Sequence, residues 1–429
     1  MENSVKNLIQ FIDHSPSCFH VIENAKKQFL EHGFIQLEEK EHWNLEEGKS
    51  YFVERNGSSM IAFHLPKKDF QGFHIVASHS DSPTYRIKEQ PEMSVEKHYT
   101  KLNIERYGGM IPETWFDRPL SVAGRIIIEE NGQIKDQLVN IDRDLMIIPN
   151  LAIHMSRSSN ESKQLNPQKD LLPLCGGNLT KDGFEEMIAK ESDVEKEDIL
   201  SYDLFLYNRM RGTTLGINEE FVAAPKLDDL ECAYSSIEGM LNAKLSKDYV
   251  TVCAVFDNEE VGSGTKQGAG STFFPEVLKR ISYLCGKNEE EYYMAVADSF
   301  MLSADNAHAV HPNYQDKTDP TNRPYINEGI VLKYNASQKY TTDANSAALV
   351  KYLCKKEKIR CQVFFNRSDM LGGSTLGNIL TGQVSIKAAD IGLPQLSMHS
   401  TYETAGCKDL GDMITLMRSF YELGKEVQI

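Results

Sequence analysis

Hydrophobic residues follow helical or strand spacings along most of the chain, and the two spacings divide it into regions. Near the N-terminus, Val5, Leu8 and Ile12 fall at helical spacing, and a second helical stretch covers 19–30. Elsewhere, short apolar runs typical of strands alternate with longer amphipathic stretches typical of helices. The predicted strands are 60–65, 73–77, 249–256, 293–297, 361–365 and 384–388, and the predicted helices are 230–245, 343–356 and 411–423. This alternation indicates an α/β domain.

The middle of the chain follows a different pattern. Two strand-like stretches flank Asn131-Gly132, a dipeptide that favours a tight hairpin turn. A length of 429 residues also exceeds what one ordinary core accommodates. We therefore predict two domains, with residues 1–90 and 223–429 forming an α/β domain and residues 91–222 forming a mostly β insertion.

Composition and charge limit the classes of protein to which the chain can belong. The formal net charge of −16 argues against a nucleic-acid partner, which needs a basic face to neutralise phosphates. The eight cysteines include no C-x-x-C pair, and the N-terminus lacks the basic and apolar regions of a signal peptide. No apolar run approaches the roughly 18 residues that span a bilayer. We expect a cytoplasmic protein with no membrane or nucleic-acid partner.

Polar islands with metal-binding side chains follow several of the apolar runs. They are 79–81, 226–229, 257–260, 303–306 and 398–400. In open α/β sheets, chemistry collects at the carboxyl ends of the strands. Zinc accepts imidazole and carboxylate ligands together, and the islands supply both types. They therefore predict a metal site at one edge of the sheet.

Amide hydrolysis is a reaction that such a site can perform. Two divalent ions about 3.5–4 Å apart supply a nucleophile and a counter-charge by bridging one water molecule. A further acid must carry the proton from that water to the leaving amine. Adjacent Glu259 and Glu260 suit this division, because neighbouring side chains in an extended or turn segment diverge. Asp81 can accept the second ring N–H of His79, which fixes a metal-binding tautomer.

Each motif also has an ordinary structural interpretation. A Glu-Glu pair is usually a solvated surface, and an isolated His-x-Asp is more often structural than catalytic. Asp228-Asp229 opens a predicted helix, where an N-cap role is as reasonable as metal binding. Their shared placement after apolar strands is what favours the metal site.

The polar islands lie within longer sequence motifs. These are SHSDSP at 78–83, TWFDRPLSVAGR at 114–125, KLDDL at 226–230, DNEEVGS at 257–263, SADNAHAVHPN at 303–313, GGSTLG at 372–377 and PQLSMHS at 394–400. Together they resemble the aspartyl aminopeptidase family of dinuclear zinc metallopeptidases over nearly the whole chain. The resemblance implies a catalytic domain of the zinc-peptidase type, with a mixed central sheet flanked by helices. It also implies that the insertion at 91–222 is a dimerisation domain.

For the metal centre, the resemblance implies two divalent metal ions per subunit, namely Zn²⁺, with Co²⁺ or Mn²⁺ as alternatives. Asp228 would bridge the two ions. The remaining ligands would be His79 and Asp305 at one ion, and Glu260 and His399 at the other. Glu259 would be the general base, and Asp81 would orient His79.

For the substrate, the resemblance implies contacts with the N-terminal residue of a peptide. These would come from Asp305, His308, Lys333 and Tyr340. The Lys333 ammonium would pair with an acidic side chain, so the expected activity is removal of N-terminal Asp or Glu by a metal-bridged water. His154 would reach the active site of a neighbouring subunit within a homo-oligomer, which the resemblance implies is a tetrahedral dodecamer.

Several alternatives stay open. The run Ser-Thr-Tyr-Glu-Thr after His399 lacks the basic residue expected in many acid-preferring relatives, so the same mechanism could serve neutral residues. A catalytically inactive structural shell would keep the fold without turnover. Lys333 could be a surface charge, and His154 an exposed loop histidine. Deacylases and carboxypeptidases share the metal chemistry but need a cation aimed at the substrate carboxylate. No G-x-S-x-G motif supports a serine nucleophile.

Overall fold

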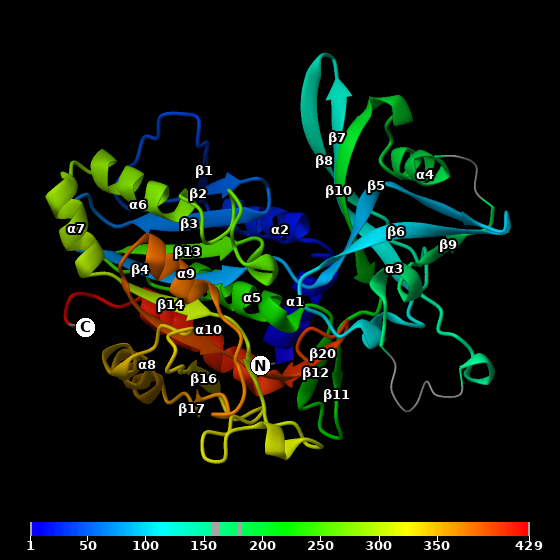
Figure 1. Ribbon diagram of the computed structural model, residues 1–429. Helices are drawn as coiled ribbons and strands as arrows, with labels where there is room; N and C mark the ends of the chain where they lie inside the picture. The colour runs from blue at the N-terminus through cyan, green and yellow to red at the C-terminus, as the bar shows by residue number, and fades with distance from the viewer. Residues whose placement is uncertain (1, 157–163, 179–181, 428–429) are drawn as a thin grey trace.

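The central element is a mixed sheet of nine strands, seen at the left of Figure 1. The computed structural model describes residues 2–156, 164–178 and 182–427. In spatial order the strands are β1 (Ile35–Leu37), β2 (Lys49–Arg55), β3 (Ser59–Leu65), β13 (Val250–Phe256), β4 (Phe73–His79), β14 (Phe300–Ala304), β18 (Lys387–Gly392), β16 (Ile330–Lys333) and β17 (Cys361–Phe364). Strands from both ends of the chain thus form one sheet.

Four adjacent strands of this sheet, β13, β4, β14 and β18, are parallel. Phe256 pairs with His79, and Ser303 pairs with Ala77, so these strands end at the same edge. The three central strands β13, β4 and β14 are buried along their whole length. Side chains that follow them are therefore brought together by the register of the sheet.

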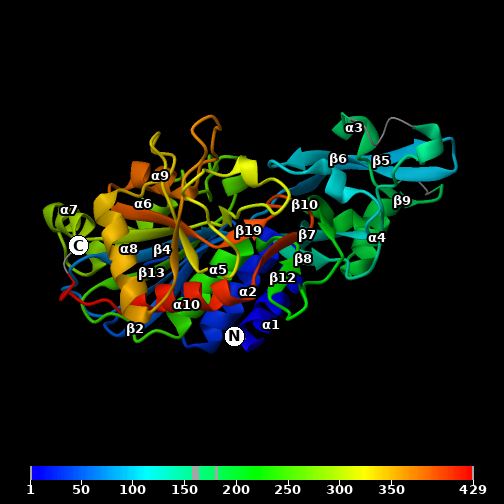
Figure 2. The same ribbon diagram turned by 90° about the horizontal axis from the view of Figure 1, so that it is seen from below.

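Helices cover both faces of the nine-stranded sheet (Figure 2). One face packs against α1 (Glu2–Asp13), α2 (Cys18–Glu31), α5 (Leu227–Leu241), α8 (Ala344–Glu357) and α10 (Cys407–Tyr421). The other packs against α6 (Phe273–Leu284), α7 (Glu289–Ala297) and α9 (Leu376–Gln383). Successive residues of β4 alternate between the two cores, with Val76 on the first face and Ile75 and Ala77 on the second.

A second sheet of six antiparallel strands projects from this body (Figure 1). In spatial order it contains β8 (Gln133–Asn140), β7 (Leu120–Glu130), β10 (Ile199–Asn208), β5 (Thr84–Val95), β6 (Tyr99–Tyr107) and β9 (Leu174–Gly176). It has its own core, and α3 (Pro167–Asp170) and α4 (Gly183–Glu191) lie beside it. The predicted hairpin at Asn131-Gly132 is β7–β8. Strand β5 begins before the predicted boundary at residue 91, and the division into domains stays a prediction.

A third sheet joins segments that are distant in sequence. Its strands are β11 (Thr213–Leu215), β12 (Phe221–Ala224), β20 (Glu403–Gly406), β19 (Pro394–Leu396) and β15 (Ala307–His308). Strand β12 leads directly into α5, and its residue Ala224 pairs with Glu403 of β20. This sheet therefore connects the start of α5 with the C-terminal segment.

The predicted fold class is confirmed, because a mixed central sheet carries helices on both faces. Two predicted strands are wrong in detail. Residues 293–297 belong to α7, which begins after Asn288 with a capping box completed by Glu291. The strand predicted at 384–388 begins only at Lys387. Among the described residues, no helix combines the length and apolar character needed to cross a membrane.

Candidate metal centre

The predicted metal ligands converge at the edge where the parallel strands end. His79 is the last residue of β4, and Asp305 directly follows β14. Glu260 lies in the 3₁₀ turn Glu259–Val261 after β13. Asp228 lies at the start of α5, and His399 lies in the turn between β19 and β20. All five line one cavity of about 290 Å³.

Asp228 lies between the two histidines. Its Oδ1 is 3.6 Å from Nε2 of His79, and its Oδ2 is 3.3 Å from Nε2 of His399. The same His399 nitrogen is 3.4 Å from Oε2 of Glu260. Burial disfavours the charged carboxylate, but attraction to the nearby imidazoles of His399 and His79 outweighs it and lowers the pKa of Asp228. One ionised carboxylate therefore faces two separate imidazoles.

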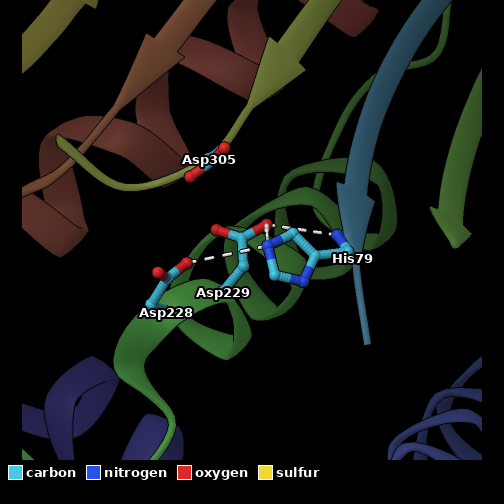
Figure 3. A group of neighbouring side chains, drawn as sticks. All are labelled: His79, Asp228, Asp229 and Asp305. Atoms are coloured by element: carbon cyan, nitrogen blue, oxygen red, sulfur yellow. Dashed lines mark hydrogen bonds and ion pairs between the residues drawn. The ribbon is translucent and has the colours of Figure 1, made fainter. Parts of the chain in front are cut away.

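The ligand atoms form two groups that share Asp228. His79, Asp228, Asp229 and Asp305 make the first group, and Asp228, Glu260 and His399 make the second. Within each group the ligand atoms lie within 4.8 Å of one another. Figure 3 shows the first group, in which the carboxylates from the start of α5 and from the loop after β14 surround His79.

Unpartnered oxygens show that these residues fit divalent cations. Oδ1 of Asp228, Oδ1 of Asp229 and Oε1 of Glu260 are buried and accept no hydrogen bond. Burying carboxylates without a partner is costly unless a cation compensates. Although burial opposes protonation, Asp229 and the other surrounding carboxylates raise the pKa of His79 well above its usual range. The cluster therefore attracts positive charge, and its imidazole and carboxylate ligands are those that zinc accepts.

Sequence reasoning missed Asp229. Its Oδ2 accepts a hydrogen bond of 3.1 Å from the backbone N–H of His79 and lies 3.9 Å from Nε2 of the same ring. Asp228 and Asp229 both have non-helical backbone angles, and the peptide bond between them is cis. The sequence contained the Asp-Asp pair, but hydrophobic spacing does not tell which of two adjacent acids faces a site.

Asp81 connects His79 with the acidic turn. Oδ1 of Asp81 lies 3.3 Å from Nδ1 of His79, and the Asp81 carbonyl lies 3.1 Å from the same nitrogen. The carboxylate also accepts the backbone N–H groups of Glu259, at 3.1 Å, and Glu260, at 3.2 Å. Its shortest hydrogen bond, 2.6 Å, is donated by the hydroxyl of Tyr107 at the end of β6. Sequence reasoning missed Tyr107, because no motif pointed to it.

Comparison with known proteins decides the family. The family described as aminopeptidase I zinc metalloprotease (M18) matches residues 11–421. The chain belongs to the M18 aminopeptidase family. An M18 family aminopeptidase 2 of Clostridium novyi is 45% identical over 437 residues, which cover 99% of this chain and 100% of that protein. The resemblance noted in the sequence is therefore confirmed, and the chain is an aminopeptidase of the zinc metalloprotease type.

Solved structures agree with this assignment. The cryo-EM structure of the Ape4 and Nbr1 complex contains a chain with a TM-score of 0.95 and 36% identity, covering 98% of this chain and 85% of that one. The mApe1 dodecamer of Saccharomyces cerevisiae gives a TM-score of 0.85 and 26% identity, covering 98% of this chain and 97% of that one. The M18 fold thus extends over the whole molecule.

Glu259 of this M18 aminopeptidase belongs to neither group of candidate ligands, although it lines the same cavity. Burial, opposed by His79 and reinforced by Asp305, raises the pKa of Glu259 to about 8. Burial likewise raises the pKa of Glu260 well above its usual range, so Glu259 is distinguished by its place outside the candidate ligand groups and not by its pKa. Glu260 thus belongs to one group of candidate ligands and Glu259 to neither, although both line the cavity.

Lys333 closes one side of the M18 cavity and is only 3% exposed. Its ammonium donates to the carbonyl of Asp305, at 2.9 Å, and to that of Asn306, at 3.0 Å. It also lies 3.6 Å from Oδ1 of Asp305 and 5.0 Å from the centre of the Tyr340 ring. Much of its charge is thus engaged within the chain, and a surface location is excluded.

The remaining predicted substrate residues lie in two places. His308 and Tyr340 line the same cavity as Lys333, together with Phe364. His154 does not line it and is instead exposed on the 3₁₀ turn Ile153–Met155 of the inserted region. The structure therefore brings together all the predicted site residues except His154.

Proposed function

We propose that this M18 aminopeptidase releases single N-terminal residues, with Asp or Glu preferred, through a centre of two divalent metal ions. The ions are Zn²⁺, with Co²⁺ or Mn²⁺ as alternatives. One would be held by His79, Asp228 and Asp305, and the other by Asp228, Glu260 and His399. The observation that carries the proposal is the position of Asp228, whose two oxygens face two different histidines.

Bound ions would supply Lewis-acid charge for the scissile carbonyl and would acidify a water molecule. The chain's own residues would do the rest. Glu259 would accept the proton of the attacking water at its carboxylate and deliver it to the leaving amine nitrogen. Asp81 would hold the His79 ring through Nδ1 and keep the turn that carries Glu259 in place. The free α-ammonium of the peptide would contact the acidic residues of the cavity.

The preference for acidic residues rests on Lys333. An ammonium has three N–H donors, and two of those of Lys333 are bonded to the carbonyls of Asp305 and Asn306. The third, beside Oδ1 of Asp305 at 3.6 Å, would be the donor for a substrate carboxylate. A preference for neutral residues is the second candidate, because Lys333 also neutralises Asp305 and the walls of the cavity include Tyr340 and Phe364.

We also propose that the subunits form a tetrahedral dodecamer in which residues 91–222 make the dimer contact. The related yeast protein was solved as a dodecamer. His154 would then enter the cavity of a neighbouring subunit. Its neighbours Ile153 and Met155 are 46% and 75% exposed, so the turn presents adjacent apolar side chains that a subunit contact would cover. All eight cysteines are free thiols, which supports a cytoplasmic location.

The specificity is tested with chromogenic amides of Asp, Glu, Leu and Lys and with their N-acetylated forms. Faster hydrolysis of the Asp and Glu amides, abolished by N-acetylation, would support the proposal. Faster hydrolysis of the Leu amide would support the second candidate. Hydrolysis of the N-acetylated forms would contradict aminopeptidase action, and inertness towards every amide would favour the structural-shell alternative.

A further inference from the structure

Glu403 is a buried carboxylate behind the metal centre, with 1% of its surface exposed. It is the first residue of β20. Its Oε1 accepts the backbone N–H of His399 at 2.6 Å, and its Oε2 accepts the backbone N–H of Asp228 at 2.9 Å. One side chain therefore holds the main chain of two proposed metal ligands at once.

These two ligands come from different parts of the fold. Asp228 lies at the start of α5, which follows β12, whereas His399 lies in the turn between β19 and β20. Glu403 stands between them, because it pairs with Ala224 at the end of β12. The relative position of Asp228 and His399 thus depends on Glu403, which bonds to their main chain and not to the His399 ring or the Asp228 carboxylate.

The turn that carries His399 needs such support. His399 has φ of 67° and Ser397 has φ of 58°, a left-handed conformation that side chains other than glycine adopt at a cost. Such a conformation persists only where its surroundings hold it in place. The 2.6 Å hydrogen bond to Glu403 is a contact that does so.

We propose that Glu403 is a positioning residue that fixes Asp228 and His399 relative to each other and thereby sets metal affinity at the site formed by Asp228, Glu260 and His399. The proposal rests on the two-metal function proposed above. Its two carboxyl oxygens each accept one of these N–H groups, so a single side chain satisfies both. Partners of metal ligands typically change metal affinity by about 10–100-fold when they are altered.

A buried carboxylate elsewhere in the chain offers a matched control. Asp409 is fully buried and accepts the backbone N–H groups of Asn327, at 2.6 Å, and Gly329, at 2.7 Å. It therefore makes the same kind of double contact as Glu403, but with no proposed metal ligand. A role in folding alone would affect both residues alike.

The test compares Glu403→Gln with Asp409→Asn and the wild type. Glutamine keeps the size of Glu403 but has one acceptor oxygen, so one N–H loses its partner. Zinc per chain is measured by elemental analysis after equilibration with buffered zinc, and affinity is measured by competition with a chromogenic chelator. We expect two ions per wild-type chain and, in Glu403→Gln, one ion bound at least about 10-fold more weakly. Asp409→Asn should melt at a lower temperature with unchanged zinc affinity.

Each other outcome has a defined meaning. Wild-type affinity for both ions in Glu403→Gln, or equal zinc loss in Asp409→Asn, would overturn the positioning role alone. Fewer than two ions in the wild type would instead contradict the proposed function. Circular dichroism and gel filtration establish whether each variant folds. If Glu403→Gln does not fold, Glu403→Asp takes its place, because it keeps the carboxyl group but shortens the side chain. Failure of both to fold beside a folded Asp409→Asn would also overturn the role.

Discussion

The adjacent acids Glu259 and Glu260 have different surroundings, although they share one turn. Oε2 of Glu260 lies 3.4 Å from the His399 ring, whereas Glu259 belongs to neither group of candidate ligands. Burial raises the pKa of Glu259 to about 8 and also raises that of Glu260 well above its usual range, so the two acids differ in their contacts and not in the direction of their pKa shifts. At the scale of single residues, the proposed metal ligand and the proposed proton carrier are thus separated by one position in the chain.

Glu259→Gln should keep the metal centre and lose turnover. The amide retains the shape of the side chain but cannot accept the proton, so kcat should fall by about 10²–10⁴-fold. Zinc content should stay at the wild-type value. The measurement is kcat together with zinc per chain, and Glu290→Gln on the exposed surface of α7 is the control. Activity within a few-fold of the wild type would contradict the role of Glu259.

The sequence contained enough to predict most of the candidate ligands and one of their supports, Asp81, but not the other supports. His79, Asp228, Glu260, Asp305 and His399 stand in motifs beside strands or a helix start, and the structure brings them together. Asp229 was missed because backbone angles at the start of α5 decide where it points. Glu403 could not be found from spacing, because its partner Asp228 lies far away along the chain.

At the scale of elements, the candidate metal centre is positioned by the ends of β13, β4 and β14. Strand β6 of the six-stranded sheet adds a contact to it. The hydroxyl of Tyr107, at the end of β6, donates to Asp81 at 2.6 Å and accepts from Asn258 at 2.9 Å. It therefore joins the six-stranded sheet to both loops that follow β4 and β13. The Asp81 carboxylate, which follows β4 of the nine-stranded sheet, is thus also held by a residue of the six-stranded sheet.

Tyr107→Phe should weaken this junction. The variant loses the hydrogen bonds to both Asp81 and Asn258, and the one to the Asp81 carboxylate alone costs about 1.5–3 kcal/mol of unfolding free energy. We also expect a several-fold lower kcat, because Asp81 holds both His79 and the turn with Glu259. Urea unfolding and kcat are the measurements. Tyr99→Phe, at an exposed position of the same strand, is the control, and equal behaviour of the two variants would contradict the prediction.

Strand β4 also carries a buried histidine that makes stability depend on pH. Burial lowers the pKa of His74 to about 3, and its ring stacks on Tyr249 with centroids 4.0 Å apart. An unfolded histidine binds a proton below about pH 6.5, whereas folded His74 does so only below about pH 3. Unfolding therefore takes up a proton in this window, and stability falls as the pH falls through it.

His74→Phe should remove this sensitivity while keeping the ring. Between pH 7 and pH 5 the wild type should lose about 2 kcal/mol more unfolding free energy than the variant, from the difference between the two pKa values. Urea unfolding of both proteins gives the comparison. Both are stripped of metal first, so that loss of bound metal in acid does not change the unfolding free energy. An equal loss in the two proteins would show that His74 is not the titrating group.

The elements themselves were predicted unevenly. The runs at 60–65, 73–77 and 249–256 correspond to β3, β4 and β13, because uninterrupted apolar residues of strand length occur there. The run at 293–297 was read as a strand although it lies in α7, since a short apolar run has no periodicity of its own. Asn288 and Glu291, spaced as a capping box, were the signal that marked the helix.

The described molecule combines a helix-covered sheet beside the cavity, a five-stranded sheet that carries His308 and the His399 turn, and a six-stranded sheet that projects from this body (Figure 1). His154 lies in the region joined to the second sheet and does not line the cavity of its own chain. In the proposed assembly His154 would instead enter the cavity of a neighbouring subunit, so the proposed role belongs to the scale of the oligomer.

Mixed oligomers test the contribution of His154. His154→Ala should keep its zinc and its assembly, measured by native mass spectrometry, but lose kcat/KM. When it is co-assembled with Glu259→Gln subunits, a cavity with intact Glu259 can receive His154 from its neighbour, so activity should reappear. Full activity of His154→Ala alone, or no recovery in mixed oligomers, would contradict a contribution between subunits.

The number and position of the bound ions test the two-metal centre most directly. Crystals grown with zinc are measured by anomalous diffraction at the zinc absorption edge. We predict two peaks per chain on opposite sides of the Asp228 carboxylate, one beside His79 and the other beside His399. A single peak, no peak, or peaks away from Asp228 would contradict the two-metal centre.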